Sequence, residues 1–177
     1  MKSSKLRAVL AATALGVGIA GPIAATAQES SNVVATEGVW TVFAADDPRE
    51  CWAVSPPEST RNTDSEGNAK EVTRGDIRLY VAYRPGQEGE VSFTGGYPFA
   101  PDSTVEVDIG GTKFNLFTEG ESAWTGSPSD DARLISALRA GSSAVVSARS
   151  SRGTLTQDTF SLSGITAATN TAKERCQ

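Results

Sequence analysis

The chain has 177 residues, a formal net charge of −5 at pH 7, no histidine and two cysteines. Without histidine, nucleophilic sites built on a Ser-His-Asp or Cys-His pair are excluded, and two cysteines alone do not complete a structural zinc site. The acidic balance disfavours nucleic acid and anionic lipid surfaces as partners, because both need clustered positive charge.

The first 27 residues are typical of a secretory signal peptide. Lys2, Lys5 and Arg7 precede an apolar run over residues 8–20, and the small residues 25–27 suit a cleavage site. Cleavage after Ala27 removes 27 residues and three cations, which leaves 150 residues with a net charge of −8. No segment is long enough to predict a transmembrane span. We therefore expect a protein of the periplasm, the cell envelope or the extracellular space.

The exported chain keeps both cysteines, Cys51 and Cys176. An even cysteine count in an oxidising compartment predicts a disulfide. This bond would close a loop of 125 residue steps, to which chain entropy assigns at most about 5 kcal/mol of stability. Around it we expect a flexible leader over residues 28–38 and a single domain over residues 39–177.

Short apolar segments alternate with turn residues along this domain, a pattern typical of antiparallel strands. The polar residues 56–74 predict a surface loop, most mobile over 60–69, and the tail 165–176 is compatible with a short strand or a helix. One helix is indicated between Ser127 as N-cap and Gly141 just past its end. We expect a mainly β fold, an antiparallel β-sandwich with this one short helix. The expected strands cover residues 39–45, 51–55, 77–84, 90–96, 105–109, 112–117, 144–150 and 155–164.

The stretch "VEVDIGGTKFNLF" contains two glycines before a lysine. A phosphate-binding loop needs a different glycine spacing and a following helix, whereas here a strand follows. With Gly110-Gly111 as a two-residue turn, Val107 pairs with Phe114 and Asp108 with Lys113, and apolar and polar side chains separate onto opposite faces. We therefore predict a structural hairpin in which Lys113 is an exposed partner of Asp108.

Aromatic residues in the connecting segments form a candidate binding surface. Tyr97 and Phe99 flank a proline where a strand ends, and Trp124 precedes the helix. Aromatics on loops that a rigid sandwich holds are common in binding surfaces; alternatively, these rings cap one open end of the core. Arg149 and Arg152 flank a tight turn and could add contacts to an acidic surface, or they are simply solvated.

The sequence gives little material for catalysis. The neighbouring carboxylates Asp46-Asp47 and Asp130-Asp131 diverge on a turn and at a helix start, so they do not suit glycoside hydrolysis. We expect no enzyme, no catalytic residue, no metal and no cofactor. The tripeptide Arg74-Gly75-Asp76 resembles an adhesive motif, but Asp76 runs directly into a strand, so Gly75 is better interpreted as a backbone pivot.

The order of several segments resembles the invasion-associated locus B family of exported proteins from Gram-negative bacteria. These segments are "CWAVSPPE", "RGDIRLYVAYRPG", "GEVSFTGGYPF", "DDARLISALRAG", "SARSSRGTLTQDTFSLSGITAA" and the closing "RC". The resemblance runs from about Trp40 to Cys176 and agrees with a Cys51–Cys176 disulfide. It assigns no role to the polar residues 60–70.

The resemblance implies an immunoglobulin-like β-sandwich in the periplasm or cell envelope, with a part in host-cell association in some members. Two interpretations of function stay open. The first is a non-enzymatic accessory domain that binds another envelope or host protein. The second is a periplasmic module that binds a small molecule or glycan through Tyr97, Phe99 and Trp124. A flat apolar patch would favour the first, and a concave pocket the second. The sequence leaves the oligomeric state open.

Overall fold

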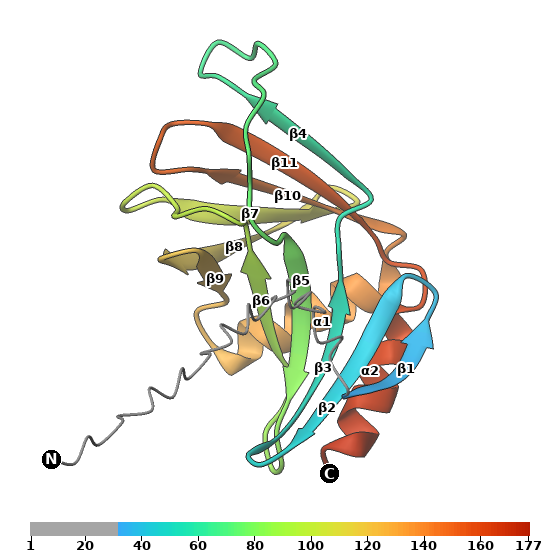
Figure 1. Ribbon diagram of the computed structural model, residues 1–177. Helices are drawn as coiled ribbons and strands as arrows, with labels where there is room; N and C mark the ends of the chain where they lie inside the picture. The colour runs from blue at the N-terminus through green and yellow to red at the C-terminus, as the bar shows by residue number, and fades with distance from the viewer. Residues whose placement is uncertain (1–31) are drawn as a thin grey trace, which may run out of the picture.

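The computed structural model describes residues 32–177, so the predicted signal peptide lies outside the described residues. The described chain forms eleven strands in one sheet and two helices (Figure 1). In chain order these are β1 Val33–Glu37, β2 Trp40–Asp46, β3 Arg49–Ser55, β4 Ser59–Thr63, β5 Arg78–Tyr83, β6 Glu90–Thr94, β7 Thr104–Ile109, β8 Thr112–Glu119, β9 Ser122–Trp124, α1 Pro128–Ala140, β10 Ser143–Arg149, β11 Leu155–Ser161 and α2 Ile165–Arg175.

The sheet is antiparallel throughout and folds back on itself. Its strand order is β1-β2-β3-β5-β6-β9-β8-β7-β10-β11-β4, and strands β7, β10, β11 and β4 run across the direction of β2, β3, β5 and β6 (Figure 1). These two sets of strands face each other across the core, since the rings of Phe93 on β6 and Phe160 on β11 lie 6.2 Å apart. Trp40 Nε1 on β2 donates to Ser161 O on β11 at 3.1 Å. The expected mainly β, sandwich-like class is confirmed.

The glycine hairpin has the predicted register. Val107 pairs with Phe114 and Asp108 with Lys113, and φ is 59° at Gly110 and 90° at Gly111, a region that glycine adopts without steric cost. The side chains differ from expectation in one respect. Lys113 Nζ bonds Glu106 at 2.8 Å, while the carboxylate of Asp108 accepts from the backbone N–H of Gly111 at 2.8 Å.

The predicted helix is α1, and its start is capped as expected. The hydroxyl of Ser127 accepts from the backbone N–H of Asp130 at 3.3 Å, which satisfies a donor that the first helical turn leaves free. Asp131 is buried and accepts from the backbone N–H of Val91 on β6 at 2.7 Å. Together with the buried Leu134 and Leu138, this contact fixes α1 against β6.

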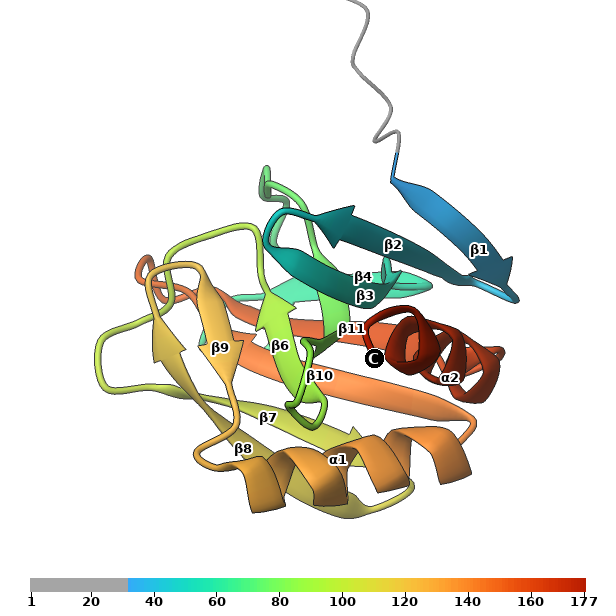
Figure 2. The ribbon, with the colours of Figure 1, turned by 90° about the horizontal axis from the view of Figure 1, so that it is seen from below.

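The tail forms a helix, α2, which is one of the two alternatives left open for it, so the fold has two helices rather than one. Its buried residues Ile165, Ala168 and Ala172 share one face and pack against β2 and β3. Small side chains allow this close approach, but they carry a weak apolar signal in the sequence. Seen from below, the C-terminal end of α1 comes near α2 (Figure 2), where Arg139 Nη2 donates to Asn170 Oδ1 at 2.8 Å.

Three further strands, β1, β4 and the short β9, lie where the sequence predicted irregular chain. Residues 33–37 of the expected leader form β1, which pairs with β2, while residues 28–31 lie outside the described part. Residues 59–63 of the expected surface loop form β4, which pairs with β11 from Thr63↔Leu155 to Ser59↔Thr159. Strands β1 and β4 are the two edge strands of the sheet. Each is ordered by backbone pairing with its one neighbour, and neither has the alternating apolar pattern by which a strand is predicted from sequence.

Candidate functional site

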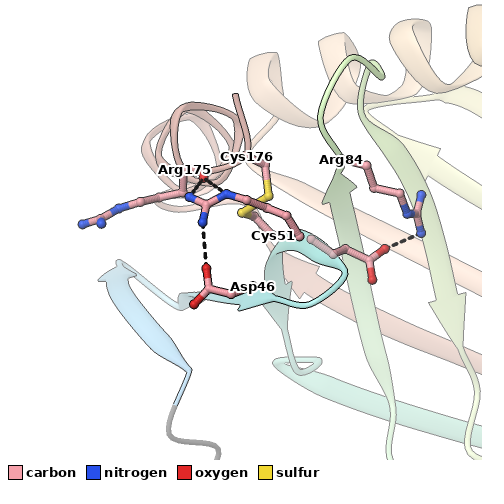
Figure 3. Close-up of a disulfide and its surroundings, with 7 residues drawn as sticks. Asp46, Cys51, Arg84, Arg175 and Cys176 are labelled. Atoms are coloured by element: carbon pink, nitrogen blue, oxygen red, sulfur yellow. Dashed lines mark hydrogen bonds and ion pairs between the residues drawn. A yellow bond between two sulfur atoms is a disulfide. The ribbon is translucent and has the colours of Figure 1, made fainter.

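The predicted disulfide joins Cys51 on β3 to Cys176 at the end of α2 (Figure 3). The S–S distance is 2.04 Å and the Cα–Cα distance 5.9 Å, and both cysteines are buried. Next to it, Arg49 Nε donates to the carbonyl of Arg175 at 2.9 Å and Arg49 Nη1 to Asp46 at 2.7 Å. The C-terminal helix is therefore held to the hairpin of β2 and β3 by covalent and polar contacts.

The aromatic segment after β6 packs into the protein rather than projecting from it. Phe99 is only 6% exposed and belongs to the core. Tyr97 is half-buried, its hydroxyl lies 2.5 Å from Thr156 Oγ1, and its ring contacts Phe99 with centroids 5.3 Å apart. Burial raises the pKa of Tyr97 above 10.0, and the hydrogen bond with Thr156 opposes this rise. Phe99 is therefore part of the core, which is the alternative to a binding surface that the sequence left open.

Beside Tyr97 lies a buried ion pair that the sequence did not predict. Arg74 donates to both carboxylate oxygens of Asp158, at 2.7 and 2.6 Å, and the two side chains are 6% and 0% exposed. The guanidinium also lies 4.9 Å from the ring centroid of Tyr97. Burial raises the pKa of Asp158, and Arg74 opposes this rise. Because Arg74 is enclosed, the Arg74-Gly75-Asp76 tripeptide is not presented as an adhesive motif.

Tyr97 and Arg152 line one groove. It has a volume of about 650 Å³ and lies between the segment at residues 70–74, the Gly96–Pro98 turn and the turn after β10. Arg149, also exposed, does not line it. Two of the five predicted surface residues therefore share a concave site.

Trp124 lies elsewhere, on β9, a strand that the sequence did not predict. It pairs across strands with Phe117, which is 50% exposed, and the two rings lie 5.8 Å apart. The same outer face continues through Ser92 to Tyr80 by cross-strand pairing. We define the apolar band as the outward-facing residues Phe43, Trp52, Val54, Tyr80, Phe117 and Trp124 on β2, β3, β5, β8 and β9.

Most of the apolar band was missed in the sequence, although a signal was present. In strands β3 and β5, Trp52 and Tyr80 alternate with the buried Cys51, Ala53 and Leu79. A strand with one polar face presents polar residues there, so large aromatics at the positions between the buried residues indicate a second apolar surface. Alternation alone could have identified it.

Other classes of site find no support among the described residues. Residues 32–177 contain no cluster of three or more His, Cys, Asp or Glu side chains that could hold a metal ion. Over the same residues, neither helix is long and apolar enough to cross a membrane.

The family described as Invasion associated locus B (IalB) protein matches residues 40–173. Among solved structures, the chain is similar to the one described as invasion associated protein b from Bartonella henselae, with 14% sequence identity and a TM-score of 0.53. The similarity covers 78% of this chain and 94% of that chain, and at this identity it concerns the fold alone. No curated protein sequence matches the chain.

Proposed function

The chain belongs to the invasion associated locus B family, and from this membership we propose that it is an exported, non-enzymatic protein of the cell envelope that binds another protein. The observation that carries the proposal is the apolar band. Its residues lie on the outer face of the sheet, and Phe117 is half exposed within it. Large apolar side chains gathered on an outer face are typical of a protein-binding surface.

Export is supported by the disulfide and by the sequence of the first 27 residues. Disulfides persist in oxidising compartments and are rare in the cytosol, and Cys51 and Cys176 are bonded. If the signal peptide is cleaved as proposed, the mass of the protein purified from its own envelope will correspond to a chain that starts at Gln28. An intact Met1 on that protein would contradict the proposal.

A non-enzymatic role is supported by the structural contacts of the carboxylates in the Asp46-Asp47 and Asp130-Asp131 pairs. Asp46 pairs with Arg49 at 2.7 Å. Asp130 accepts from Ser127 at the helix start at 2.6 Å, and Asp131 accepts from the backbone of β6. Each of these groups has a structural partner, so none of them is poised as a paired acid and base.

The geometry gives less support to a glycan-binding module. That alternative needs Tyr97, Phe99 and Trp124 together in one concavity, but Phe99 is in the core and Trp124 lies in the apolar band with Phe117. The family and the Bartonella protein are both described as invasion associated. We therefore include host surface proteins, beside envelope proteins, among the proposed partners.

The test is affinity capture of the tagged, exported protein with crosslinking in its own envelope and on host cells. We expect Phe117→Ser and Tyr80→Ser to reduce the captured partner, because each removes apolar contact area. Leu155→Ser is the matched control, since Leu155 is 40% exposed on β11 and lies outside the apolar band. Equal capture by the two band variants and the control would refute the proposed surface.

A further inference from the structure

The groove beside Tyr97 is separate from the apolar band, because no residue of the band lines it. One of its walls is the segment Glu71–Thr73, which belongs to the stretch that runs from the loop after β4 to the start of β5 (Figure 1). The turn that contains Arg152 also lines the groove.

The backbone of this wall is held at both ends but not between them. Lys70 N–H donates to Asn62 O on β4 at 2.9 Å, and Gly75 N–H donates to Gly96 O at 2.8 Å. The three residues Glu71–Thr73 make no backbone hydrogen bond within residues 32–177, and all three are exposed. The segment therefore offers free N–H and C=O groups on an anchored stretch of chain, as an exposed sheet edge does.

The floor of the groove limits the chemistry of a ligand. The Arg74 and Asp158 charges satisfy one another, so neither is free to hold an ion. The ring of Tyr97 is occupied by contacts to Arg74 and Phe99, which leaves it poorly suited to stacking on a sugar. The lining carries side chains of both signs, the cations Lys70 and Arg152 and the carboxylates Glu71 and Glu121.

We propose that this groove binds an extended peptide segment of a partner protein, which pairs with the backbone of Glu71–Thr73 as an added strand. Backbone hydrogen bonds supply affinity in this mode, and side chains on alternate positions supply specificity. The groove volume of about 650 Å³ lies within the range of binding pockets, about 300–1,000 Å³. The side chains of both signs favour a polar peptide of mixed charge. This inference shares one assumption with the proposed function, namely that the partner is a protein.

The test uses peptides selected from a random phage-displayed library on the purified mature protein. Val72→Pro removes one backbone N–H that has no partner within residues 32–177, and Val72→Ala is the matched control, since it removes only side-chain atoms. We expect Val72→Pro to weaken the selected peptides about tenfold, as the loss of one backbone hydrogen bond predicts, and Val72→Ala to weaken them much less.

Amide exchange by NMR gives a second measurement on the unaltered protein, in case proline disturbs the segment. We expect the N–H groups of Glu71–Thr73 to gain protection when a selected peptide is added. The inference would be overturned if the selected peptides left these amides unprotected and bound Val72→Pro normally. It would also be overturned if the library gave no binding peptide while the protein bound a glycan array and Arg152→Glu abolished that binding. Phe117→Ser should retain peptide binding, which separates failure of the proposed apolar surface from failure of the groove.

Discussion

Replacing Arg74 with methionine would leave the carboxylate of Asp158 buried without its partner. The two side chains are 6% and 0% exposed and share two hydrogen bonds, at 2.7 and 2.6 Å. Removing one member of a buried pair costs about 3–5 kcal/mol. Loss of the cation over Tyr97 adds about 0.5–1 kcal/mol. We therefore expect Arg74→Met to lower the free energy of unfolding by about 3.5–6 kcal/mol, measured by urea titration with tryptophan fluorescence.

The double variant Arg74→Met/Asp158→Leu is the matched control. It removes both charges, so no unpaired ion remains in the interior, and buried pairs replaced by apolar residues often keep their stability. We expect this variant to recover most of the loss. If both variants were equally unstable, local packing rather than the ion pair would account for the effect.

The pH dependence follows from the raised pKa of Asp158. Burial already raises this pKa and Arg74 opposes the rise, so Arg74→Met should raise the folded-state pKa further above the unfolded value. The folded variant then binds a proton more tightly than the unfolded chain does. Its loss of stability should be full at neutral pH and shrink as the pH falls through the folded-state pKa. A loss under about 1 kcal/mol at neutral pH, or one that stays constant in acid, would refute the reasoning.

The disulfide joins residues 125 positions apart, so Cys176→Ser should lower the free energy of unfolding by up to about 5 kcal/mol. Cys51→Ser should lower it by the same amount. Equal alkylation of the cysteines with and without reductant would contradict the bond. Gly111→Val places a branched residue at φ 90° and should cost about 1–3 kcal/mol. Lys113→Ala removes only an exposed ion pair and should cost less; the reverse order in urea titrations would count against the turn as the structural element. The raised pKa of Tyr97 means that the folded protein keeps the phenol proton longer than the unfolded chain, so stability should fall as the pH rises past 10.0. Tyr97→Phe should flatten this decline, and an unchanged slope would exclude Tyr97 as its cause.

Elements whose signals are local could be predicted from the sequence. Two adjacent glycines and the separation of polar and apolar faces specified the β7–β8 hairpin and its register. Ser127 and the apolar positions after it specified α1. The cysteine count and the predicted signal peptide together predicted the disulfide. The hairpin and the helix are stabilised by residues close in sequence, and the disulfide is favoured by the oxidising compartment that the signal peptide predicts.

Features that depend on residues far apart in the sequence could not be predicted, because long-range packing sets them. Strand β4 has the polar sequence STRNT and is ordered by pairing with β11. Arg74 was placed in a surface loop, but it is buried because Asp158, 84 residues away, satisfies its charge. The same packing enclosed Phe99 and left Phe117 outside. Which aromatic ring is free to bind depends on what covers it, and residues remote in sequence provide that cover.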